Sequence, residues 1–390
     1  MQPNFGFDLF IERNEDGLYS RVMDSPVGTA AAIFRMPMSS AEIESLARAA
    51  SSPYKPDLRQ FENARLSARD LGIRLFDAVF AGEVGALFHR CMDIAYQQST
   101  RLRIRLSLTE TPELLRLPWE AMFNYLRDEY MALSPHAPFA RYLELSHHIR
   151  PLKVQAPLRM LVVIPDPPGY PPVETEREWL GLVDTLDTLG ARRELIVERM
   201  GRPTLFELQR RLRQNAYHMV HFVGHSLFNS QAQESYLVLE DEQGRGRLVS
   251  GAHMGAILRD HFALRLVVLH SCGAWQPLPR EPFTHVAYSL VKRGIPSAIA
   301  VPYELTDRAG LAFNYELYSR VAAGEEVDVA LAEARRAMLA DTAGIEWAAP
   351  VLVSRIPDGR IFDVQPAEES AQATRPSRTA ERYAGYRRTW

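Results

Sequence analysis

The sequence predicts an α/β protein with a mostly parallel sheet covered by helices on both faces, preceded by a smaller α+β domain. From residue 158 onward, near-continuous apolar runs alternate with amphipathic segments, which is typical of buried parallel strands joined by helices. Before residue 150 the two periodicities are mixed instead. A proline-marked join, "RPLKVQAPLR" (150–159), separates these two parts. We therefore expect an accessory domain over 1–150 and an α/β domain over 151–364.

The remaining residues, 365–390, predict a mobile C-terminal tail. The stretch "ESAQATRPSRTAERYAGYRRTW" lacks the apolar periodicity needed to build a core. Three aromatic side chains stand among its arginines, a combination that is common at interfaces. The tail is therefore also a candidate to dock on the protein itself or on a partner; these aromatic residues are Tyr383, Tyr386 and Trp390.

Composition excludes several function classes. The chain has 390 residues and a formal net charge of −3, so no global charge favours nucleic acid or an anionic membrane. Two cysteines cannot form a disulfide framework, and the N-terminus lacks the basic and apolar regions of a secretory signal. No apolar run approaches the length of a membrane span. We expect a cytoplasmic protein that binds neither nucleic acid nor membrane.

The first 150 residues show hairpin, helix and strand signals. Asp16-Gly17 separates two strand-like runs, and helical patterns follow over 40–50 and 57–98. Arginine alternates with apolar residues in "RLRIRLSL" (101–108), which predicts a half-exposed strand. "LPWEAMF" (117–123) predicts a short helical anchor with Trp119 buried.

The second part predicts a regular alternation of strands and helices. Thr175 with Glu178, and Thr204 with Glu207, have the spacing of capping boxes at helix starts. Predicted strands cover 158–164, 194–200, 217–223, 235–241, 264–270 and 297–302. Predicted helices cover 174–189, 204–214, 250–261 and 283–294, with two more ending near residue 343.

Two of the predicted strands end on a reactive side chain. His225 follows "YHMVHFVG" and Cys272 follows "LRLVVLHS", 47 residues further along the chain. The carboxyl ends of parallel strands share one edge of a sheet, which is where active sites of open α/β sheets form. A thiol needs a base to become a nucleophile, and histidine can also protonate the leaving amine. We interpret His225 as base and Cys272 as nucleophile.

Turns beside this dyad can supply an oxyanion hole. The backbone amides of Ser226 and Cys272 are the candidate donors to a tetrahedral intermediate. Gly224 is expected to turn the chain sharply and so aim the imidazole. His221 and His225 are four residues apart, which suits two metal ligands on a helix but not on a strand. We therefore expect no metal and no cofactor.

A resemblance strengthens this interpretation. "YHMVHFVGHS", "YLVLEDEQGR", "LVVLHSCGAW" and "LVKRGIPSAIAVPYELTD" resemble successive blocks of the CHAT-domain family, relatives of caspases and separase. The likeness spans about residues 100–362, and it implies a caspase-hemoglobinase fold and peptide-bond hydrolysis by His225 and Cys272. Ser226 stands where the family commonly has glycine, which predicts strain if that position needs a positive φ. "CGAW" also replaces the small acidic patch that commonly follows the cysteine.

The resemblance also leads to expectations about substrates and partners. Pockets for the residue before the cut are built in such peptidases from loops after core strands. Asp166 and Glu304 occupy those loops here, and two carboxylates favour Arg or Lys in a substrate. We expect a protein substrate and a regulatory protein bound by the accessory domain, in a setting such as bacterial immunity or cell death. Two alternatives remain open: an inactive CHAT scaffold that binds peptides, and a regulator that acts by holding another protein.

Overall fold

The computed structural model describes residues 5–39, 41–42, 68–145, 149–229, 231–232, 234–272, 282–341 and 344–366. The helix expected over 40–50 and the first residues of the pattern over 57–98 lie outside this part of the chain. So do residues 367–390 of the expected tail and the residues 273–281 that follow Cys272.

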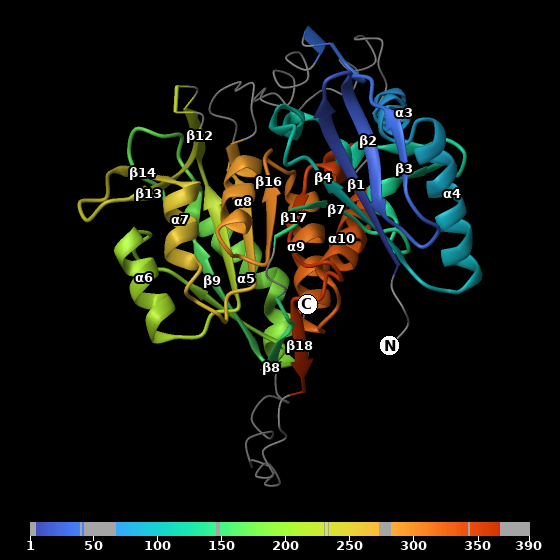
Figure 1. Ribbon diagram of the computed structural model, residues 1–390. Coiled ribbons are helices and arrows are strands. Elements are labelled where there is room, and N and C mark those ends of the chain that lie inside the picture. Colours follow the sequence, from blue (N-terminus) through green and yellow to red (C-terminus); the bar gives the residue numbers. More distant parts are fainter. Residues whose placement is uncertain are drawn as a thin grey trace, which may run out of the picture.

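One sheet of eleven strands runs through the described structure (Figure 1). Its order is β10-β9-β11-β15-β16-β17-β7-β4-β1-β2-β3. Neighbours are parallel except at β16–β17, β1–β2 and β2–β3, so the expected mostly parallel sheet is confirmed. The strands are β1 Phe5–Asn14, β2 Gly17–Asp24, β3 Ala30–Ile33, β4 Leu102–Ser107, β7 Phe139–Tyr142, β9 Leu158–Val163, β10 Leu195–Arg199, β11 Met219–Gly224, β15 Leu266–Ser271, β16 Ser297–Val301 and β17 Val351–Ser354.

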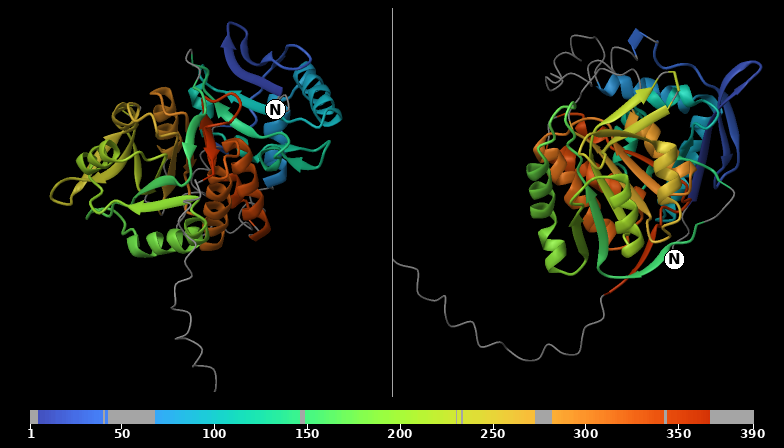
Figure 2. Two further views of the ribbon diagram at one scale, coloured as in Figure 1. Left: turned by 90° about the horizontal axis from the view of Figure 1, so that it is seen from below. Right: turned by 90° about the vertical axis from the view of Figure 1, so that its left-hand side faces the viewer.

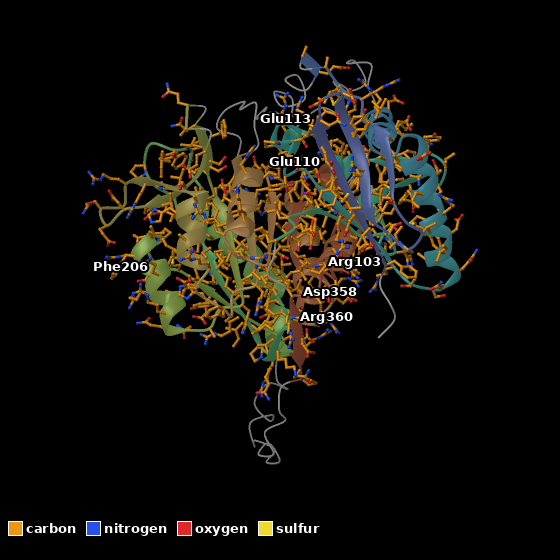
Figure 3. All side chains as sticks on the ribbon, in the orientation of Figure 1. Arg103, Glu110, Glu113, Phe206, Asp358 and Arg360 are labelled. Carbon is orange, nitrogen blue, oxygen red and sulfur yellow. The ribbon has the colours of Figure 1, made fainter. Side chains whose placement is uncertain are left out.

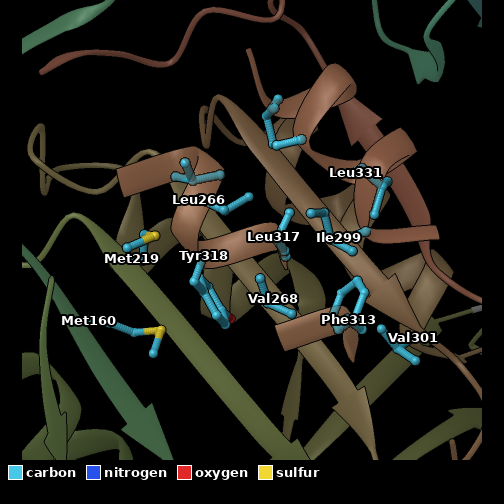
Figure 4. Close-up of a cluster of buried hydrophobic side chains, with 14 of the residues drawn as sticks. Met160, Met219, Leu266, Val268, Ile299, Val301, Phe313, Leu317, Tyr318 and Leu331 are labelled. Atoms are coloured by element: carbon cyan, nitrogen blue, oxygen red, sulfur yellow. The ribbon is translucent and has the colours of Figure 1, made fainter. Parts of the chain in front are cut away.

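Helices cover both faces of the sheet, as the apolar patterns predict (Figure 2). On one face α5 (Thr175–Ala191), α9 (Asp307–Ala322) and α10 (Val327–Asp341) pack on alternate residues of the strands. Met160, Met219, Val268 and Ile299 belong to this cluster, together with Phe313 of α9 (Figure 4). The opposite face is covered by α6 (Leu205–Gln214), α7 (Gly251–Leu258) and α8 (Pro282–Lys292).

The N-terminal part continues the same sheet. The predicted hairpin forms β1 and β2, and α3 (Ala68–Val79) and α4 (Gly82–Gln97) pack on β1 and β4 in a third cluster with the buried Trp119. Strand β7 pairs with β4 on one side and β17 on the other, so the sheet crosses the expected boundary at residue 150 without a break. That boundary stays a prediction.

Strand β4 differs from its prediction. It lies between β1 and β7 rather than half exposed. Arg103, which is labelled in Figure 3, is 2% exposed. Arg103 Nε donates to Asp328 Oδ2 of α10 at 2.7 Å. The period-two pattern is the same for an exposed arginine and for one that is buried with a partner, so the sequence alone does not separate the two cases.

Of the two predicted capping boxes, the one at the start of α6 has the expected N-cap and the one at the start of α5 does not. The Thr204 side chain accepts from the Glu207 amide at 3.1 Å, as predicted. Thr175 is instead the first residue of α5, whose N-cap Glu174 makes no side-chain cap hydrogen bond. No helix in the described ranges is long and apolar enough to cross a bilayer.

Short strands and turns complete the fold. Strands β12 (Ser226–Asn229), β13 (Glu234–Glu240) and β14 (Gly246–Ser250) form a separate antiparallel sheet, of which only β13 was predicted. The remaining elements are β5 Phe123–Asn124, β6 Glu129–Tyr130, β8 Leu152–Gln155, β18 Phe362–Gln365 and the 3-10 turns Pro112–Arg116, Trp119–Ala121, Met131–Leu133 and Glu346–Ala348.

Candidate active site

Strand register brings His225 and Cys272 together. In the parallel pair β11–β15, Gly224 lies opposite Ser271, and each dyad residue comes next in its chain. The Cys272 amide donates to the Gly224 carbonyl at 3.0 Å, which extends the ladder by one step. Side chains alternate along strands, so both dyad side chains lie on the face covered by α5 and α9. Adjacent strands lie about 4.8 Å apart, which places the dyad at neighbouring positions.

The imidazole of His225 is held by a backbone carbonyl. Its Nε2 is 2.8 Å from the carbonyl oxygen of Pro171, and because a carbonyl only accepts, Nε2 carries the proton. Nδ1 of the neutral ring then has a free lone pair for a thiol proton. The Tyr170 ring lies nearly parallel to the imidazole, at 16° with centroids 6.2 Å apart. The loop between β9 and α5 therefore fixes both the tautomer and the plane of the ring.

The backbone near His225 corrects the expectation for Gly224 and does not meet the condition for strain at Ser226. Gly224 ends β11 without a positive φ, so it does not supply a sharp left-handed turn. Its lack of a side chain matters for space instead, because a Cβ there would lie 3.1 Å from the Phe222 ring and 3.3 Å from Pro165. Ser226 also avoids positive φ, so replacing the family's glycine introduces no strain of that kind.

The two expected oxyanion donors differ in their hydrogen bonding. The Cys272 amide is engaged with Gly224 in this conformation, so the sheet already uses that donor. The Val238 amide donates to the His225 carbonyl at 3.0 Å, which makes 225 and 238 a hydrogen-bonded pair. Because such pairs alternate in antiparallel ladders, the next residue, Ser226, directs its amide away from β13.

The Cys272 thiol is partly buried among carboxylates. Burial is the largest effect and raises its pKa, which nearby Glu178, Glu304, Asp166 and Glu174 raise further, to about 12. Each negative charge disfavours a second negative charge on the sulfur. In this conformation the thiol is therefore protonated at neutral pH, and ionisation requires a proton acceptor or a compensating cation.

These carboxylates come from the two loops that the sequence singled out and from the start of α5. Asp166 is held in place, because its Oδ1 accepts from the Val173 amide at 2.9 Å and its own amide donates to Glu240 at 3.0 Å. Arg177 partly compensates the charge by binding Glu174 at 2.8 Å and Asp307 at 2.5 Å. Burial raises the pKa of Glu178, the most enclosed of the group.

A model of the CHAT domain matches residues 69–355, which is most of the chain. This protein belongs to the CHAT domain family. The match begins at α3 and ends after β17, so it includes β4, β7 and the helices that pack on them, as well as the strands of the dyad. The resemblance of the sequence to this family is confirmed.

Solved structures similar to this CHAT protein include two of the Saccharomyces cerevisiae separase–securin complex. The 2.6 Å structure is 13% identical, with a TM-score of 0.38, over 88% of this chain and 21% of that one. The 3.0 Å structure is 14% identical, with a TM-score of 0.38, over 80% of this chain and 20% of that one. The CHAT chain thus spans about a fifth of either. No curated protein matches the sequence.

Some residues around the CHAT dyad were not predicted from the sequence. Pro171 contributes only its carbonyl, which any residue carries, so no side-chain signal marks it. Glu174 and Glu178 stand in a helix start that already attracts carboxylates for reasons of helix stability. Their second role, beside the thiol, is visible only when α5 is placed against the sheet edge.

Proposed function

We propose that this CHAT protein is a cysteine endopeptidase that cleaves a protein partner, with His225 as base and Cys272 as nucleophile. The observation that carries the proposal is the shared strand edge, at which register places the two residues side by side with the imidazole oriented by Pro171. An oriented histidine and a neighbouring cysteine supply the general base and the nucleophile that acyl transfer requires.

The geometry supports a definite order of proton transfers. Nδ1 of His225 takes the proton from Cys272 Sγ as the sulfur attacks the scissile carbonyl carbon. The carbonyl oxygen becomes an oxyanion, for which we propose the Ser226 amide as donor, with the Cys272 amide joining only if its bond to Gly224 opens. The imidazolium then protonates the departing amine, and water hydrolyses the thioester by the same base.

Substitution of the dyad tests the proposal. Cys272→Ala, His225→Ala and the double variant should each lose proteolysis, with the double variant little worse than either single one. Cys272→Ala should change the free energy of unfolding by about 1 kcal/mol or less. His225→Ala should cost about 1–3 kcal/mol, because His225 is buried and the Pro171 carbonyl would lose its donor. An electrophilic peptide should label Cys272 and spare the fully buried Cys91, for which Cys91→Ala is the control. Full cleavage of a partner by Cys272→Ala would refute the mechanism.

We further propose that the carboxylates beside Cys272 select Arg or Lys as the residue before the cut. A bound guanidinium or ammonium group would neutralise Asp166 and Glu304, and it would also lower the pKa of the thiol by removing the repulsion that raises it. A basic substrate would thus help to ionise the nucleophile that attacks it.

Charge-removing variants test this specificity. Asp166→Asn and Glu304→Gln should each reduce kcat/KM for peptides cut after Arg by about tenfold, because a hydrogen bond to a charged group is lost. Asp187→Asn, an exposed carboxylate on α5, is the matched control and should change nothing. A peptide library cleaved preferentially after apolar or acidic residues would contradict the idea.

A second candidate is a catalytically silent CHAT scaffold that binds a peptide or protein in the same groove. The pKa of about 12 for Cys272 favours it, since a protonated thiol is a weak nucleophile. Labelling by an electrophilic peptide separates the two, because a scaffold would bind the peptide without forming the covalent adduct.

Composition and family support a proposed cellular setting for the peptidase. Two cysteines without a disulfide suit a reducing cytoplasm. Relatives in this family support a task in bacterial immunity or cell-death signalling. The first 150 residues are our candidate for binding a regulatory protein, and co-purification with mass spectrometry would identify both regulator and substrate.

A further inference from the structure

A second pocket lies at the end of the sheet opposite the dyad. Its volume is about 530 Å³, within the range of small-molecule sites. Leu264 and Arg265 precede β15, and Ile295 and Pro296 precede β16. Arg355 follows β17, which runs antiparallel to β16, so all five residues lie at the same end of the sheet. The other lining residues are Leu145, Ile149, Arg259, His261, Phe262, Lys292, Arg293 and Gly294.

The polar lining of this pocket is cationic. Among the described lining residues, five side chains are arginine or lysine and none is a carboxylate; the five are Arg259, Arg265, Lys292, Arg293 and Arg355. Asp260 lies close by and contacts Arg259 at 3.5 Å, but both side chains are exposed. Such a concentration of like charge is unfavourable unless an anion compensates it.

Arg265 combines partial burial with an Nε that lacks a hydrogen-bond acceptor among the described residues. Burial also lowers the pKa of its guanidinium. The backbone around it is fixed, because its amide donates to His218 at 2.9 Å and its carbonyl accepts from Ser297 at 3.2 Å. The Arg355 amide donates to Pro296 at 3.1 Å, so two cationic positions are held by the sheet itself.

An aromatic ring completes the pocket. Phe262 is 82% exposed and lines the same pocket as the cations, so its ring is open to a ligand bound there. Exposed rings beside arginines suit planar heterocycles, which can stack on the ring while charged groups bind the cations. We propose that this pocket binds a small ligand of nucleotide type, with phosphates on Arg265, Lys292 and Arg293 and the base against Phe262.

The position of the pocket separates it from the proposed chemistry. Arg265 and Cys272 lie at opposite ends of β15, seven residues apart, which corresponds to about 23 Å of extended chain. A ligand here leaves the dyad open, so the inference goes beyond the proposed function and does not rest on it. Binding is therefore measured directly, and the Cys272→Ala variant should bind as the parent protein does.

Calorimetric titration of the full chain with ATP and with inorganic tripolyphosphate, both without metal, tests the proposal. The double variant Lys292→Ala/Arg293→Ala should weaken the binding of both probes by about tenfold or more, since charged hydrogen bonds are lost. The control Arg90→Ala/Arg247→Ala removes two exposed positive charges elsewhere and should bind both probes as the parent does. Phe262→Ala should weaken ATP and leave tripolyphosphate unchanged.

Absence of binding to the parent protein would overturn the proposal, as would equal weakening by the control pair, because the effect would then be general charge. If Phe262→Ala leaves ATP binding unchanged, the nucleotide assignment is wrong. The substituted residues are exposed, and thermal unfolding of each variant shows whether the fold is intact.

Discussion

Three histidines, one just before β11, one within β11 and one within β15, are buried without charge. Burial, the first cause in each case, lowers the pKa of His218 and of His270 to about 4 and that of His221 to about 3. His218 Nδ1 accepts from the Arg159 amide at 2.8 Å, and His221 Nδ1 lies 2.5 Å from the Tyr318 hydroxyl. His270 packs edge-on against His221 and shares a strand face with Cys272. These side chains act as neutral polar groups in the protein core.

The protein should lose stability on mild acidification because of these histidines. In the unfolded chain they bind protons near pH 6.5, whereas in the folded protein they stay neutral down to about pH 4, so stability is full above pH 6.5 and falls below it. Each should cost about 2 kcal/mol between pH 7 and pH 5. Urea unfolding at pH 7 and at pH 5 measures this loss of unfolding free energy. The loss should be smaller for His221→Gln than for the parent protein, and it should be unchanged for the exposed His253→Gln. Equal drops in all three proteins would contradict this account.

At the scale of elements, β4 ties the N-terminal part to α10. Arg103 and Asp328 have side chains only 2% and 6% exposed and are joined at 2.7 Å. Burial raises the pKa of Asp328, while Arg103 opposes that effect. Arg101 immediately precedes the same strand. It makes a longer and more exposed contact to Glu326, at 3.3 Å. The two pairs differ in burial more than in chemistry.

Breaking the buried pair should be costly. Arg103→Leu leaves Asp328 uncompensated in the interior and should lower the free energy of unfolding by about 3–5 kcal/mol. The matched change Arg101→Leu should cost about 1 kcal/mol or less, as for surface pairs. Arg103→Leu/Asp328→Leu should recover part of the loss, because no lone charge remains. Chemical denaturation of the four proteins measures this, and similar values for the two single variants would show that burial does not decide the cost.

At the scale of the whole molecule, the proposed active site and the cationic pocket lie at opposite ends of one sheet. The dyad and its carboxylates lie where β11 and β15 end, and the cationic pocket lies where β15 and β16 begin. The chain's net charge of −3 conceals this polarity, since acidic and basic groups cancel in the sum. A locally basic tail would suit the acidic end.

Deleting residues 367–390 tests the docking expected of the tail while leaving β18, which ends at Gln365, intact. If the tail binds the acidic groove, its loss should raise the peptidase rate; if it binds a partner, partner affinity should fall. The melting temperature should change little in either case, because the deleted residues lack a core-forming pattern. A truncated protein that matches the full chain in both assays would leave the tail without a role.

The sequence alone was enough to predict the fold class of this protein and the strand-end positions of the proposed dyad residues. Period-two and period-3.6 apolar patterns are local properties, so the strands and helices after residue 150 could be read from them, and the parallel class followed. Strand ends carrying His225 and Cys272 were visible for the same reason. Short strands such as β12 and β14 escaped, since four or five residues at a sheet edge carry little periodic signal.

Only the tertiary structure decided which groups surround those positions. Arg103 is buried because a partner 225 residues away neutralises it, and no local pattern contains that partner. The same holds for the other groups. The fold brings the Pro171 carbonyl to His225 and the carboxylates of α5 to Cys272, although they are distant in sequence from these residues. It also brings together the five cations of the second pocket. Electrostatic and hydrogen-bonding environments depend on distances in space, whereas a sequence records only distances along the chain.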